Sequence, residues 1–151
     1  MYLCNQIAIL AHQNIPQDPD PMKEILIPIS PGELLDKITI LRIKSARISD
    51  PEKLVNIRKE LEMLDNIWNQ SVTPDATITQ LTEELTSINE ALWDIEDDIR
   101  DEERQKRFGD RFIELARSVY VTNDRRAEAK KQVNLHLGSD IVEEKSYQDY
   151  S

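Results

Sequence analysis

Hydrophobic residues recur at intervals of three and four along most of this chain, which is the spacing of one face of an α-helix. The clearest series keeps alternating between these two steps and stops at Ile99. Its members are Ile78, Leu81, Leu85, Ile88, Leu92, Ile95 and Ile99. Such a heptad seam is typical of helices that pack side by side, as in a coiled coil. We therefore predict a long helix over 76–107, ending in an almost wholly charged, solvated tip after Ile99.

An earlier helix is indicated by the start signal Ser30-Pro31-Gly32-Glu33. Ser30 can cap the helix, Pro31 suits its first position, and Glu33 completes a capping box. The helix should run to about Ile48 and be the most buried, because apolar residues cover more than half of its circumference. The free N–H groups at Ser30, Gly32 and Glu33 are also a candidate anion site, although capping is the preferred interpretation.

A second start signal at Asp50 and Pro51 predicts another helix, which ends near Ser71. Trp68 lies on its apolar seam, so we expect this side chain in the core. After a turn at 108–110, a fourth helix should cover 111–137, with Gly138 as its C-terminal stop.

Together these patterns predict an all-α, antiparallel helical bundle built from two helical hairpins, the second one longer. A short extended segment at 24–29 should precede the first helix, because Pro28 restricts this run to an edge strand or an extended segment. The only plausible partner strand is 141–143.

The composition divides the chain into three parts. Residues 1–23 form a proline-rich extension or linker, 24–140 the helical domain, and 141–151 an acidic C-terminal tail. Met22 directly follows the prolines and is an alternative start.

Charge and cysteine content narrow the function. The net charge of −10 argues against nucleic acid and against anionic membrane surfaces, since both bind clusters of Lys and Arg. With Cys4 as the only cysteine, an internal disulfide and a cysteine-based zinc site are excluded. The apolar run near the N-terminus is too short for a membrane span and lacks the basic residues of a signal peptide. We therefore expect a cytoplasmic protein without a cofactor.

A dense acidic run shares the predicted third helix with the heptad seam. Folding the chain at Gly109 into an antiparallel hairpin places this run opposite polar residues on the fourth helix. Three of these residues, Asn123, Arg126 and Lys130, interrupt the apolar face of that helix. The candidate junction or ligand site comprises Asp94, Asp97, Asp98, Asn123, Asp124, Arg125, Arg126 and Lys130. Buried charges persist when they are paired and hydrogen-bonded, and carboxylates facing arginines meet that condition.

Three interpretations of this junction stay open. It is a salt-bridged seam that fixes the helix register, an anion site built on Arg125, Arg126 and Lys130, or a divalent cation site. The weak metal candidates are Glu90, Asp94 and Asp98, which share a helix face, although such spacing arises easily by chance in an acidic helix. For an enzyme, the chain lacks a visible Ser/His or Cys/His grouping and a glycine-rich phosphate loop. It also has Ser87 where all-α nucleotide pyrophosphohydrolases place a third glutamate after Glu83-Glu84.

Three strings carry a family resemblance: 27–41 (IPISPGELLDKITIL), 92–100 (LWDIEDDIR) and 122–127 (TNDRRA), the last preceded by Tyr120. They resemble a family of small bacterial proteins classed as a domain of unknown function. The resemblance covers about Met22 to Tyr147, and it implies a bacterial origin and a stand-alone domain but no activity.

We therefore expect a non-enzymatic interaction or regulatory module. The alternative is an anion- or metal-binding enzyme acting on a small, nucleotide-like molecule at the junction. Because the longer hairpin should project past the shorter one, part of its seam needs cover, and a homodimer or another protein partner would supply it. Trp93 lies just off the seam, and we expect it to pack against a second helix or subunit rather than stack on a ligand.

Overall fold

The computed structural model describes residues 25–148. This part contains four helices, α1 (Pro31–Arg47), α2 (Pro51–Ser71), α3 (Ala76–Arg104) and α4 (Asp110–His136), and no strand. The predicted all-α bundle is confirmed, with helix ends close to the expected positions. The described residues 25–29 are not a strand, and neither is their candidate partner at 141–143. The extension 1–23 lies outside the described residues.

The helices begin where the start signals place them. Ser30 Oγ accepts a hydrogen bond from the Glu33 amide at 3.3 Å, and Asp50 caps α2 in the same way. Asp75 Oδ1 caps α3 by accepting from the Ile78 amide at 2.7 Å. These side chains satisfy amide groups that the first turn of a helix leaves without partners.

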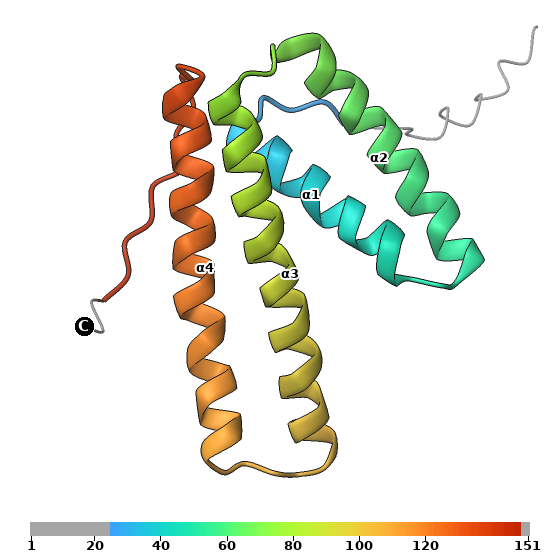
Figure 1. Cartoon of the computed structure of the whole chain (residues 1–151), viewed down its shortest axis with the longest axis vertical. Coiled ribbons are helices and arrows are strands. Elements are labelled where there is room, and N and C mark those ends of the chain that lie inside the picture. Colours follow the sequence, from blue (N-terminus) through green and yellow to red (C-terminus); the bar gives the residue numbers. More distant parts are fainter. Residues whose placement is uncertain (1–24, 149–151) are drawn as a thin grey trace, which may run out of the picture.

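The first helix organises the others (Figure 1). α1 packs against all three other helices, whereas the backbone of α2 approaches only that of α1. α3 and α4 lie side by side as an antiparallel hairpin, and their lower half extends well past the α1–α2 hairpin (Figure 1). The fold is therefore a three-helix core of α1, α3 and α4 with α2 on the outside.

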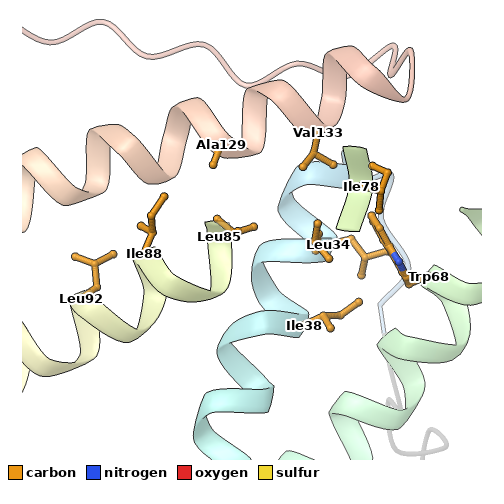
Figure 2. Packing of buried hydrophobic residues seen from close by; sticks show 10 residues of the cluster. Leu34, Ile38, Trp68, Ile78, Leu85, Ile88, Leu92, Ala129 and Val133 are labelled. Atoms are coloured by element: carbon orange, nitrogen blue, oxygen red, sulfur yellow. The ribbon is translucent and has the colours of Figure 1, made fainter. Parts of the chain in front are cut away.

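The core follows the predicted seams, and the seam of α3 becomes less buried toward the turn of the long hairpin. Figure 2 shows side chains of α1, α3 and α4 gathered together, with Trp68 of α2 near Ile78. The buried cluster comprises Leu34, Leu35, Ile38, Trp68, Ile78, Leu85, Ile88, Leu92, Ala129 and Val133. α1 contributes more buried residues than any other helix, as predicted, and Trp68 is in the core. Beyond Leu92 the α3 seam is only half-buried, at Ile95 and Ile99.

Gly32 allows α1 to approach α4 closely. Its amide donates a 2.7 Å hydrogen bond to Asn134 Oδ1 on α4. A Cβ at position 32 would lie 2.9 Å from that oxygen and closer still to the carbonyl oxygen of Lys130. The backbone of α4 cannot retreat from this contact without moving the whole helix, so position 32 requires the absence of a side chain.

We predict that Gly32→Ala lowers the free energy of unfolding by about 1–3 kcal/mol, because the added methyl group overpacks the α1–α4 contact. Chemical denaturation measures this change. Gly109→Ala is the matched control, since a Cβ there meets nothing within 4 Å; it should change stability by less than about 0.5 kcal/mol. Equal losses from the two variants would contradict the close approach.

Candidate functional site

The centre of the molecule holds a buried ion pair between α1 and α4. Arg126 donates to both carboxylate oxygens of Asp36, from Nε at 2.9 Å and from Nη2 at 2.6 Å. The Asp36 side chain is 2% exposed and that of Arg126 is 28% exposed. This bidentate geometry is the strongest form of an arginine–carboxylate contact, and it fixes both partners in direction as well as distance.

Three further polar side chains complete the network. Asn89 of α3 donates from Nδ2 to Asp36 Oδ1 and to Thr39 Oγ1, both at 2.9 Å. Thr39 donates its hydroxyl proton to the Asp36 carbonyl at 2.8 Å. Asn123 Oδ1 accepts a longer bond of 3.4 Å from Arg126 Nη1. All three core helices therefore contribute polar groups to one buried point.

The spacing along α1 explains how these groups reach the junction. Gly32, Asp36, Thr39 and Ile43 follow one another at intervals of four, three and four, so they share one helix face, and all four are buried. Hydrogen bonding to Asp36 raises the pKa of Arg126 and outweighs the opposing effect of burial. Arg126 is thus a fixed cation whose charge is already matched by a carboxylate.

Lys130 forms a second ionic contact one turn further along α4. Its ammonium group pairs with Glu33 at the start of α1 and with Glu143 of the C-terminal tail at 2.8 Å. Burial lowers the pKa of Lys130, but hydrogen bonds to Glu143 and Glu33 outweigh it and raise the pKa overall. The bond from Lys130 lowers the pKa of Glu143. Lys130 therefore ties the tail and the start of α1 to α4.

A pocket of about 370 Å³ opens beside the ion pair. Its lining combines apolar, amide and charged side chains from all three core helices. They are Ile40, Asn89, Leu92, Trp93, Glu96, Asp97, Arg100, Asn123 and Arg126. This size suits a small molecule or a single side chain.

The structure separates the three predicted aspartates. Asp94 is an exposed residue, with its side chain 64% exposed, and it pairs with Arg47 of α1. Asp98 pairs with Arg111 at 2.9 Å, next to the turn into α4. Only Asp97 lies at the pocket with Asn123 and Arg126. The expected direct pairing of these acids with the arginines near 125 is therefore replaced by Asp36.

The other candidates lie elsewhere. Arg125 is exposed, and Asp124 lines a separate pocket of about 540 Å³ between α4 and the tail. Trp93 is half-buried, with the Arg47 guanidinium 5.9 Å from its ring centroid.

The backbone amides of the candidate anion site already have acceptors within the protein. At the start of α1, Gly32 N–H donates to Asn134 and Glu33 N–H to Ser30. Within residues 25–148, no group of three or more His, Cys, Asp and Glu side chains is arranged to hold a metal ion.

Sequence reasoning missed Asp36, Thr39 and Asn89. A signal for Asp36 was present, because an aspartate on a helix that is apolar around most of its circumference has few solvated directions. Asn89 directly follows the seam residue Ile88, and nothing in its spacing marks it as a partner of α1.

The comparisons with known proteins define a family rather than an activity. Residues 25–150 match the model of a family of unknown function, DUF6165. The chain belongs to this family. No curated protein and no solved structure matches it. In the described part of this DUF6165 chain, none of the helices has the length and apolar character needed to span a lipid bilayer.

We predict that Arg126→Met lowers the free energy of unfolding by about 3–5 kcal/mol, because it leaves the Asp36 carboxylate buried without its counter-charge. Adding Asp36→Asn to that variant should recover part of the loss, because the unpaired charge is then absent. Urea unfolding of the two variants measures both effects.

Arg42→Met is the control for this experiment, since it breaks an exposed ion pair with Asp65. It should cost less than about 1 kcal/mol. An Arg126→Met protein as stable as Arg42→Met would show that the buried pair contributes little.

We also predict that acid releases the C-terminal tail. Glu143 has a pKa lowered from its ordinary value of 4.5, so its contact with Lys130 is complete above that value and is lost as the pH falls through the lower, folded pKa. Amide NMR signals of 141–148 should therefore shift with a midpoint below pH 4.5.

Glu143→Gln should remove this transition. Glu144→Gln should keep it, because Glu144 is 76% exposed and lies 3.7 Å from a different lysine, Lys131. A midpoint at or above the ordinary value would contradict the assignment.

Proposed function

We propose that this protein is a non-enzymatic helical interaction module that acts as a homodimer through the projecting end of the α3–α4 hairpin. The observation that carries this proposal is the uneven burial of the α3 seam. Leu85 and Ile88 are enclosed, whereas Ile95 and Ile99 further along the same seam are only half-buried. Placement in the bacterial cytoplasm belongs to the same proposal and rests on composition and family resemblance.

The junction is better suited to holding the helices than to chemistry. Its central cation, Arg126, is engaged by Asp36, and Lys130 is engaged by two glutamates. A charge that is already neutralised by hydrogen-bonded partners has to give up those partners before it can bind a substrate. This favours a structural role for the ion pairs and leaves recognition to the outer surfaces.

The projecting end has the composition of a contact surface. Phe108 and Ile113 are 53% and 52% exposed there, and exposed apolar groups favour association. Residues 98–117 contain equal numbers of acidic and basic side chains. Two copies of this acidic protein therefore meet there without strong repulsion. The partner that we propose for the projecting end is a second copy of the chain.

Light scattering after size-exclusion chromatography tests the dimer. The wild-type protein should have twice the mass of the chain, and Ile113→Glu should shift it toward the monomer, because a charge buried in the interface is unfavourable. Val55→Glu is the matched control, since Val55 is 67% exposed on α2. This variant should keep the mass of the dimer. A monomeric wild type, or equal effects of both variants, would contradict the proposal.

The alternative is an enzyme that acts on a small, nucleotide-like molecule at the junction, and one observation favours it. Asp97, Asn123 and Arg126 do line a common pocket. An anionic substrate would have to compete with Asp36 for Arg126, and Glu96 and Asp97 would repel it. Saturable binding of a nucleotide or sugar phosphate in a thermal-shift screen, lost in Arg126→Lys, would favour this alternative over the interaction module.

A further inference from the structure

We propose that the pocket beside Asp36 and Arg126 binds a small organic cation with two donor ends, such as a diamine or a guanidinoalkylamine. This goes beyond the proposed dimer and does not depend on it. The pocket is lined by α1, α3 and the middle of α4. The exposed apolar residues Phe108 and Ile113 of the proposed dimer contact lie beyond it, at and next to the turn between α3 and α4.

The first observation is that one acceptor of a buried side chain has no donor within the described part of the protein. Asn89 is 5% exposed, and both bonds to Asp36 and Thr39 come from its Nδ2. Asp36 as a carboxylate can only accept, so the amide nitrogen must face it and the carbonyl oxygen must point elsewhere. No hydrogen bond within the described part of the chain reaches that oxygen.

This oxygen opens into the pocket. Every fully enclosed side-chain nitrogen and oxygen in the described residues has a partner, so the free Asn89 oxygen belongs to the surface that Asn89 contributes to the pocket. Because this oxygen is accessible, water can donate to it, and a ligand can take the place of that water. An N–H group from a ligand would satisfy this oxygen.

The second observation is the charge balance of the lining. Arg126 is matched by Asp36, and Arg100 is matched by Glu96 in the preceding turn. Asp97 has no ion pair with any residue from 25 to 148. The nearby cation Arg47 interacts with Asp97 only through space and is itself paired with Asp94. The Asp97 carboxylate at the pocket therefore still favours a positive charge.

The third observation is the spacing of these two residues along α3. Asn89 and Asp97 lie eight positions apart on α3, which corresponds to about 12 Å along the helix axis. The apolar side chains Leu92 and Trp93 lie between them, on the same stretch of helix. A ligand that meets both ends therefore has donors at each end of a short apolar chain.

Isothermal titration calorimetry of the full chain with agmatine and with 1,5-diaminopentane tests this proposal. We expect saturable binding of at least one of them at a single site per chain. Uncharged 1,5-pentanediol, which has the same length as the diamine, should not bind. Asp97→Asn should weaken binding about tenfold, because it replaces a charge-assisted hydrogen bond by a neutral one.

Glu84→Gln is the matched control, since it removes one exposed carboxylate from α3 outside the pocket. It should leave the affinity unchanged. Equal losses from Glu84→Gln and Asp97→Asn would mean that the cations are attracted only by the overall negative charge, and the proposal would fail.

Two further outcomes separate the possibilities. No binding of either small cation would overturn the proposal, and so would binding of an arginine-containing peptide in the absence of small-cation binding, which would indicate a protein partner. Repeating the titration with Ile113→Glu separates this site from the dimer. A monomeric variant that still binds the cation supports the pocket by itself, whereas loss of binding in that variant alone would overturn the independence of the two sites.

Discussion

The bidentate contact between Asp36 and Arg126 sets the arrangement of the three core helices. Removing these charges from water is costly, and the cost is offset only when both carboxylate oxygens and the guanidinium edge are aligned. That alignment allows one register of α1 across α3 and α4, and Asn89 of α3 reinforces it by donating to both Asp36 and Thr39 of α1. Apolar packing supplies the driving force for folding, while this polar contact selects one crossing point among several that would bury similar apolar area.

The sequence predicted elements and seams well, because these depend on local periodicity. The heptad seam of α3 and the caps at Ser30 and Asp50 could each be predicted from one short segment of the sequence. The matching seam of α4 was harder to see, since its heptad steps pass through polar Thr122 and Arg126. The partner of Arg126 could not be predicted, because it depends on where α1 crosses the hairpin. Helix periodicity does not specify a crossing point.

Placing the acidic run in the fold shows why a dense cluster of carboxylates need not be one site. Successive residues of a helix point in different directions. Asp94 therefore turns to Arg47 on α1, Asp98 to Arg111 on α4, and Asp97 to the pocket. One run thus serves two helix contacts and one candidate binding surface. The sequence identified the pocket-lining residues Asp97, Asn123 and Arg126, but grouped them with neighbours that lie elsewhere.

The hydrogen bond between Gly32 and Asn134 joins positions 102 residues apart, and this separation matters during translation. α1 emerges from the ribosome early, yet most of its circumference is apolar and its docking surface on α4 is synthesised last. Until residue 134 has left the exit tunnel, α1 therefore exposes apolar surface that only α2 and α3 can cover. Chaperone engagement with the first half of the chain, relieved once synthesis is complete, follows from this order of events.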